Sequence, residues 1–80
     1  MTLHFIGIDP DTDTGQCPAV FVDDDSGDFL FQGDLITDAA TLAKVAAHSP
    51  IARHEAVVRL PARMRTIIRE AIDVSHGAAI

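Results

Sequence analysis

Two short apolar runs on either side of an acidic turn are the feature that most limits how this chain can fold. Residues 19–22 and 29–32 are rich in β-branched and aromatic side chains, which favour strands. Between them, Asp24-Asp25-Ser26-Gly27 has the composition of a tight turn, with a glycine available for a positive φ. The pattern predicts a β-hairpin.

Local patterns also predict the elements around this hairpin. Residues 3–8 favour a strand that ends at Asp9-Pro10, and residues 55–60 favour another strand. The carboxylate of Asp38 can cap an alanine-rich helix over residues 39–47, because the first amides of a helix lack partners within it. Pro61 suits the first position of a second helix.

The second helix, over residues 61–75, is predicted to be amphipathic. At 100° per residue its apolar side chains fall within one sector, so we expect that sector to face a core or an interface. They are Leu60, Met64, Ile67, Ile68, Ala71 and Ile72.

Together these elements predict an α+β fold. It has a small antiparallel sheet in the order strand, strand, strand, helix, strand, helix, and the C-terminal helix packs on one sheet face. Residues 1–75 are expected to form one domain, and residues 76–80 a frayed tail.

The hairpin is expected to carry apolar side chains on both faces. Val20 and Val22 point away from Phe21, and Phe29 and Phe31 point away from Leu30, because successive strand residues face opposite sides. A core of this size contributes only about 3–5 kcal/mol, and the single cysteine among 80 residues excludes an internal disulfide. We therefore expect a homodimer or hetero-oligomer that covers the second face. A local sandwich with residues 3–8 is the competing explanation.

Charge is divided unevenly along the chain. Residues 1–38 hold nine aspartates and no Lys or Arg, whereas residues 39–80 hold all six basic residues and three acids. The net charge of −6 argues against binding to nucleic acid or anionic membranes, since both require neutralised phosphates. Arg63, Arg65 and Arg69 could contact DNA directly, but three arginines on a chain of this net charge make a weak phosphate-binding surface. No apolar stretch is long enough to span a bilayer, so a cytoplasmic location is expected.

An acidic loop is the main candidate for metal chemistry. Asp9, Asp11 and Asp13 alternate like the start of a calcium loop, but the pattern breaks at Thr14 and Val20, where a glycine and a glutamate are required. The strand-end Asp9 also looks like the Mg²⁺ ligand of ribonuclease-H-like proteins, although that fold needs a longer sheet. Cys17 and the four histidines lack zinc-module spacing. No catalytic residue, metal ligand or cofactor is therefore assigned.

Several segments resemble one family of small proteins. Residues 17–23, 30–33 and 36–38, and above all Arg59-Leu60-Pro61-Ala62-Arg63-Met64 followed by residues 67–71, are similar to small actinobacterial proteins typical of Streptomyces. Members of this family are commonly encoded beside XRE-type helix-turn-helix regulators. The resemblance implies a regulatory or accessory role and carries no known catalytic residue.

The leading hypothesis is a noncatalytic protein-interaction module. It would be an accessory partner of a helix-turn-helix transcriptional regulator or part of a toxin–antitoxin-like pair. The alternative is a metal-dependent enzyme or metal-binding protein that uses the Asp9-Asp11-Asp13 loop. Acidic residues would steer a basic partner and an aromatic side chain would anchor it. The predicted partner-binding residues are Asp11, Asp13, Phe21, Asp24, Asp25, Phe29 and Phe31.

Overall fold

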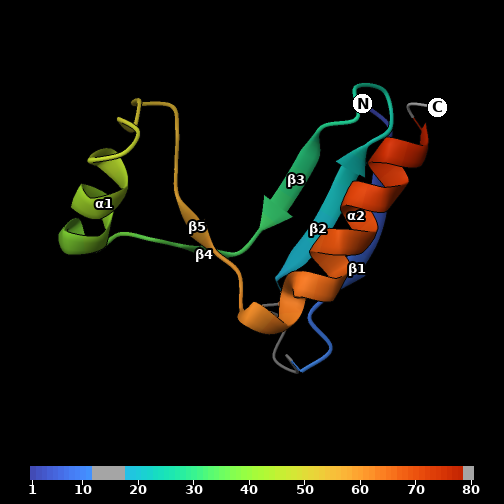
Figure 1. Cartoon of the computed structure of the whole chain (residues 1–80), viewed down its shortest axis with the longest axis horizontal. Helices are drawn as coiled ribbons and strands as arrows, with labels where there is room; N and C mark the ends of the chain where they lie inside the picture. The colour runs from blue at the N-terminus through green and yellow to red at the C-terminus, as the bar shows by residue number, and fades with distance from the viewer. Residues whose placement is uncertain (12–17, 79–80) are drawn as a thin grey trace.

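A three-stranded antiparallel sheet is the centre of the fold in the computed structural model, which describes residues 1–11 and 18–78 (Figure 1). Its strands are β1 (Leu3–Ile8), β2 (Ala19–Asp23) and β3 (Phe29–Gln32), in the order β1-β2-β3. Both helices lie outside this sheet, so the predicted α+β class is confirmed.

The predicted hairpin is β2 and β3. Val22 pairs with Phe29 and Ala19 with Gln32, so the register is continuous over four pairs. The turn is closed by Asp23 N–H donating to the Asp28 carbonyl at 2.8 Å and by Gly27 N–H donating to the Asp23 carbonyl at 2.7 Å. Gly27 has a φ of 83°, a left-handed conformation that residues with a Cβ rarely adopt.

The chain leaves the sheet after β3, and residues 33–60 form an extension that we call the arm. Strand β4 (Asp34–Leu35) pairs antiparallel with β5 (Val58–Arg59) in a separate two-stranded ribbon. The arm continues to α1 (Ala39–Ala46), which lies well away from the sheet in Figure 1. The sequence predicted a longer strand over residues 55–60 and missed β4, because strands of two residues are too short to show alternation.

Asp38 begins α1 as predicted. Its carboxylate accepts a hydrogen bond from Thr41 N–H at 2.9 Å, and its own backbone is extended. Hydrogen bonding from Thr41, through its side chain and then its backbone, lowers the pKa of Asp38 below its ordinary value. The cap is local, which is why the sequence alone identified it.

The C-terminal helix begins with a tighter turn than expected. A 3₁₀ turn, η1 (Ala62–Met64), precedes α2 (Arg65–Ala78), and Pro61 is the residue before the first helical position. Met64 N–H donates to the Pro61 carbonyl at 2.9 Å. Helix α2 extends three residues past Ser75, where the sequence analysis placed its end. The division between a domain and a frayed tail stays a prediction.

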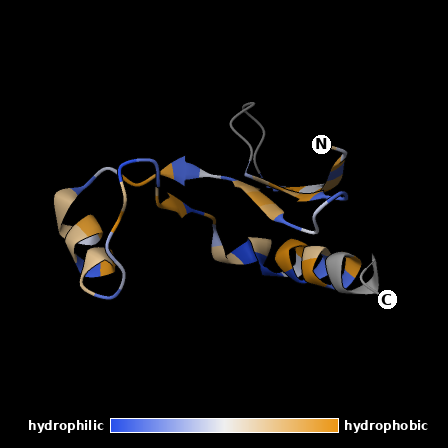
Figure 2. Ribbon diagram, turned by 90° about the horizontal axis from the view of Figure 1, so that it is seen from above, coloured by the Kyte–Doolittle hydropathy of each residue, from blue (hydrophilic) through white to orange (hydrophobic). Residues whose placement is uncertain are grey.

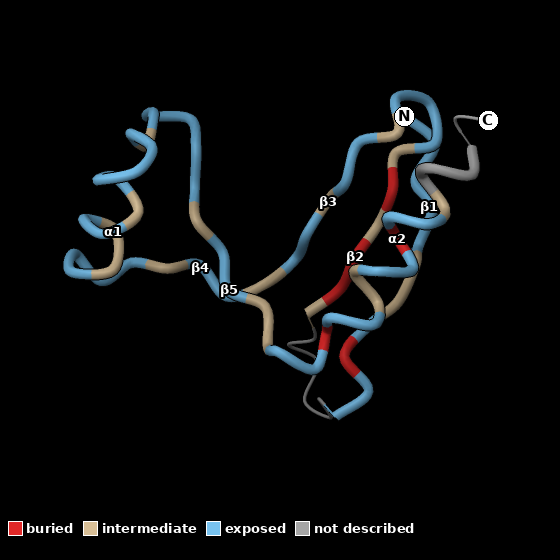
Figure 3. The backbone as a smooth tube through the Cα atoms, viewed as in Figure 1, coloured by how far each residue is buried: buried red, intermediate tan, exposed pale blue. Residues whose placement is uncertain are grey.

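The core lies between α2 and one face of the sheet. Val20 and Val22 of β2 meet Met64 and Ala71, and all four are buried. Figure 3 shows these buried stretches on β2 and along the helix. Ile6, Leu60, Ile67 and Ile68 pack around them. Ile72 is 51% exposed, so it does not belong to this core, and a place at an interface stays a prediction.

The molecule is more extended than a compact domain of its length. Its radius of gyration is 14.1 Å, whereas a compact chain of this size has about 12 Å. The arm accounts for the difference, since it extends away from the sheet and helix (Figure 1). Within residues 1–11 and 18–78, no helix combines the length and apolar character that crossing a bilayer requires.

Candidate interaction surface

One face of the main sheet exposes large apolar side chains. Leu3, Phe5 and Ile8 are 53%, 54% and 45% exposed. Phe5 pairs across the strands with Phe21, which pairs in turn with Leu30, and directly paired residues share a face. We call this surface the open face. Its members are Leu3, Phe5, Phe21 and Leu30, together with Ile8, which the register shift after Phe5 pairs with Ala19, two residues before Phe21.

Helix α2 lies on the opposite side of the sheet from the open face (Figure 2). The rings of Phe5 and Phe21 are tilted by 56° with centroids 5.6 Å apart, so the two side chains pack on each other. Phe21 and Leu30 are half-buried. Within the described residues the local sandwich considered above does not form, because β1 pairs edge to edge with β2 and lies in the same sheet.

The two other predicted aromatic anchors lie on the face that carries α2. Phe29 pairs with Val22 and Phe31 with Val20, and both valines face the helix. The rings stack with centroids 6.3 Å apart and an interplanar angle of 15°. They remain 44% and 46% exposed, because α2 packs over β1 and β2. Phe21 therefore does not share a surface with Phe29 and Phe31.

The predicted acidic residues lie at both ends of the sheet. Asp24 and Asp25 form the hairpin tip beside the start of β1, whereas Asp11 follows the other end of β1. Asp25 accepts from Thr2 N–H at 3.0 Å, and His4 Nδ1 lies 3.3 Å from Asp24 Oδ1. The structure thus separates Asp11 from the tip. Asp13 lies outside the described residues.

The carboxylate of Asp9 lies fully buried at the end of the sheet near Asp11. Arg63 donates to Asp9 through Nε at 2.7 Å and through Nη2 at 2.5 Å, so the pair is bidentate. The side chain of Asp9 has no exposed area, while that of Arg63 is 48% exposed. The hydrogen bond to Asp9 raises the pKa of Arg63 above its usual value. The pair joins the end of β1 to η1.

This ion pair bears on the metal alternative. Both carboxylate oxygens of Asp9 contact a guanidinium, and Asp9 Oδ1 also accepts from Asp11 N–H at 3.1 Å. Among the described residues, no group of three His, Cys, Asp or Glu side chains is placed to hold a metal ion. Because Asp13 is not among them, a metal site in the full loop stays a prediction.

Two of the three arginines considered for DNA contact make hydrogen bonds within the chain. Arg63 is bound to Asp9, and Arg65 Nε donates to the Ala62 carbonyl at 2.9 Å. Binding to phosphates would have to compete with these contacts. Fewer arginine donors are therefore available for phosphates than the sequence alone indicates.

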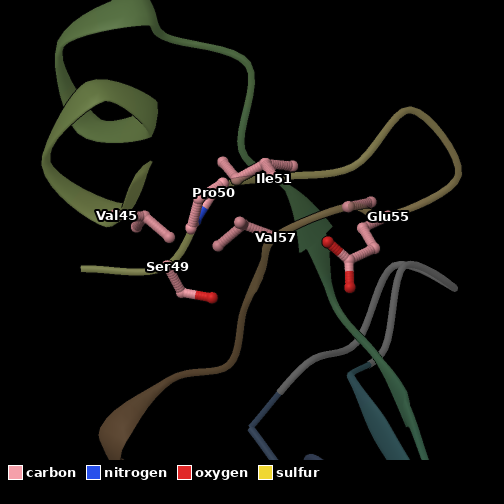
Figure 4. A pocket seen from close by; sticks show the side chains of 7 residues that line it. Val45, Ser49, Pro50, Ile51, Glu55 and Val57 are labelled. Carbon is pink, nitrogen blue, oxygen red and sulfur yellow. The ribbon is translucent and has the colours of Figure 1, made fainter. Parts of the chain in front are cut away.

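The arm contains a shallow pocket between α1 and the chain that returns from it (Figure 4). Its volume is about 370 Å³. Glu55 is the one acidic side chain in its lining, and its carboxylate accepts from Ala52 N–H at 2.8 Å, which closes the local turn. A second hollow, of about 510 Å³, shares Ile51, Glu55, Ala56 and Val57 with the first.

Comparison with protein-family models, curated proteins and solved structures finds no match to this chain. Sequence reasoning singled out Phe21 but missed Leu3, Phe5 and Ile8 on the same face. The spacing of Leu3 and Phe5 in a predicted strand indicates that they share a face. Only the β1–β2 register shows that this face is also the face of Phe21.

Proposed function

We propose that this chain is a noncatalytic protein-interaction module that docks through its open face. The observation that carries the proposal is the exposure of Leu3, Phe5 and Ile8 along one face of strand β1. Removing apolar area from water contributes about 25 cal/mol per Å². Several large apolar side chains exposed on one face are typical of a contact site for another protein.

The size of the core supports the same conclusion. Among the described residues only five apolar side chains are buried: Ala19, Val20, Val22, Met64 and Ala71. So small a core contributes only a small free energy of unfolding. A partner on the open face would bury the side chains of Leu3, Phe5 and Ile8, which remain about half exposed in the chain alone. We infer that the functional form is a homodimer or hetero-oligomer.

The family resemblance points to the kind of partner. Its segments suggest an accessory protein of a helix-turn-helix transcriptional regulator, or one member of a toxin–antitoxin-like pair, acting in the cytoplasm. The acidic hairpin tip supports a basic partner, because Asp24 and Asp25 stand exposed beside Asp28. Such charges accelerate association more than they strengthen the final complex.

Light scattering during size-exclusion chromatography tests this proposal, with the chain expressed alone and together with the products of its neighbouring genes. The open-face variant is Phe5→Ser. The matched control is Leu35→Ser, since Leu35 is 61% exposed on the arm, away from the open face. We expect Phe5→Ser to weaken association about tenfold or more, as at an interface hot spot, and Leu35→Ser to leave it unchanged.

Two results would contradict the proposal. The first is a chain that stays monomeric alone and with every neighbouring product. The second is an assembly that Phe5→Ser and Leu35→Ser affect equally, because the open face would then have no special part in it. Circular dichroism of both variants establishes that each is folded before association is compared.

A further inference from the structure

The outer edge of β3 offers backbone groups that the sheet does not use. In an antiparallel ladder, residues alternate between pairs that exchange hydrogen bonds and pairs that do not. Asp23 N–H donates to the Asp28 carbonyl, so the next pair along, Val22 with Phe29, is of the non-bonded kind. Phe21 with Leu30 is then bonded, and Val20 with Phe31 is not.

Phe29 and Phe31 therefore direct their N–H and C=O groups away from β2. Within the described residues, β3 is an edge strand, and no hydrogen bond joins its outer side to another element. The two residues present two donors and two acceptors in a row. Their exposed and stacked rings stand on the α2 face beside this edge.

The two edges of the sheet differ in how they are protected. Strand β1 has a register shift between Phe5 and Gly7, and such a bulge interrupts pairing with a further strand. Strand β3 has the sequence Phe-Leu-Phe-Gln, with a continuous register and neither a charge nor a proline. Natural edges usually carry one of these protections. The edge of β3 is thus suited to accept a strand.

We propose that the β3 edge binds an extended, basic segment of a partner protein as a fourth strand of the sheet. Alternate apolar side chains of that segment would pack on Phe29 and Phe31, and up to four backbone hydrogen bonds would join it to β3. This mode is known as β-augmentation. The inference rests on the proposed function only in taking a protein as the partner, since it uses a different surface.

Charge complementarity selects the chemistry of the segment. Asp28 precedes β3 and Asp34 follows it, and both are exposed, so carboxylates flank the edge at each end. Arg59 lies opposite Asp34 across β4 and β5, so the negative charge is less compensated at the Asp28 end. Lys or Arg at the ends of the segment would lie near them. A second copy of β3 would instead bring its own Asp28 and Asp34, and like charges across strands destabilise the pairing.

The arm also favours a single segment over a second whole sheet. Figure 1 shows β4, β5 and α1 on the same side as the free edge of β3. An added strand would lie about 4.8 Å from β3. A second three-stranded sheet would extend much further in that direction, toward the arm.

The test begins with a phage-displayed library of random dodecapeptides selected on the wild-type chain. We expect the enriched peptides to alternate apolar residues, to carry Lys or Arg near their ends and to lack proline at their centre. The decisive pair of variants is Phe31→Pro and Phe31→Ala. Both remove the ring, but only proline removes the outward N–H, and an edge position tolerates proline because β2 does not use that group.

Phe31→Pro should bind the selected peptides roughly two- to tenfold more weakly than Phe31→Ala, the usual effect of one lost hydrogen bond. Equal affinities would overturn the proposal. Hydrogen exchange on the wild-type chain needs no variant: bound peptide should slow exchange of the Phe29 and Phe31 amides, while the Leu30 amide serves as the internal reference. Unchanged exchange at both phenylalanines would also overturn it.

Two further outcomes separate the alternatives. A wild-type dimer that Phe31→Pro dissociates, together with no enriched basic peptide, would assign the edge to a second copy and overturn the basic segment. Phe5→Ser should leave peptide binding intact, so failure of the open face and failure of the edge give different results.

Discussion

Arg63 binds both carboxylate oxygens of Asp9, although 54 positions separate the two residues. The contact fastens the end of β1 to the first turn of the C-terminal helix. Asp9 is fully buried and Arg63 about half exposed. Because of this difference in burial, removing Asp9 and removing Arg63 should cost different amounts of stability.

Arg63→Ala is expected to destabilise the fold more than Asp9→Ala. Removing Arg63 leaves a buried carboxylate without its guanidinium, whereas removing Asp9 leaves a guanidinium that water can solvate. The double variant should be more stable than Arg63→Ala alone. Urea denaturation followed by circular dichroism measures all three, and a larger loss for Asp9→Ala would contradict this account.

The cap of α1 should depend on pH. Because the folded state lowers the pKa of Asp38 below 3.8, its ionised form stabilises the helix above that pH, and the contribution is lost as the pH falls through the folded pKa. The Thr41 amide resonance should shift over this range in NMR spectra. Asp38→Asn keeps an acceptor without titrating, so its Thr41 resonance should not respond; an identical response in both proteins would argue against the cap.

Met64→Ala should cost about 2–5 kcal/mol of unfolding free energy, as large-to-small substitutions in cores do. Met64 is fully buried among Val20, Val22 and Ala71. Ile72→Ala on the same helix is the control, and it should change stability by about 0.5 kcal/mol or less because Ile72 is half exposed. Similar costs for the two in urea titrations would show that the helix packs through a different stripe.

Gly33→Ala should displace the arm relative to the sheet. A Cβ at Gly33 would lie 2.5 Å from the Arg59 carbonyl oxygen, too close for backbone to tolerate. We expect NMR shift changes concentrated in β4 and β5 and a loss of the Asp34–Arg59 cross-strand contact. Gln32→Ala, one residue earlier and exposed, should leave these signals in place. An unperturbed ribbon in Gly33→Ala would mean that β5 approaches less closely.

Much of the local structure could be predicted from the sequence because its causes are local. The β2–β3 hairpin follows from two strand-forming runs around a turn that contains Gly27. The start of α1 follows from Asp38 and the amides beside it. The candidate surface could be predicted only in part, since Phe21 was identified and its neighbour Phe5 was not.

The sequence did not fix the extent of two features, and both have the same physical cause. Ile72 falls within the apolar sector of a helical wheel, but the width of the covered stripe depends on where α2 lies across β1 and β2. Residues 55–60 have the composition of a strand, yet pairing limits β5 to Val58–Arg59 because β4 is equally short. The composition of a segment indicates which structure it favours, but the length of the neighbouring strand determines how many of its residues pair.

The sequence by itself determined the α+β class, the hairpin, the capped helix and the amphipathic character of α2, because each depends on residues close together in the chain. Only the tertiary structure decided that Asp9 meets Arg63, that Phe5 packs on Phe21, and that no element of residues 1–11 and 18–78 pairs with the outer edge of β3. Those outcomes depend on register and on the placement of α2. Both are fixed by packing between segments far apart in the sequence, which no local pattern specifies.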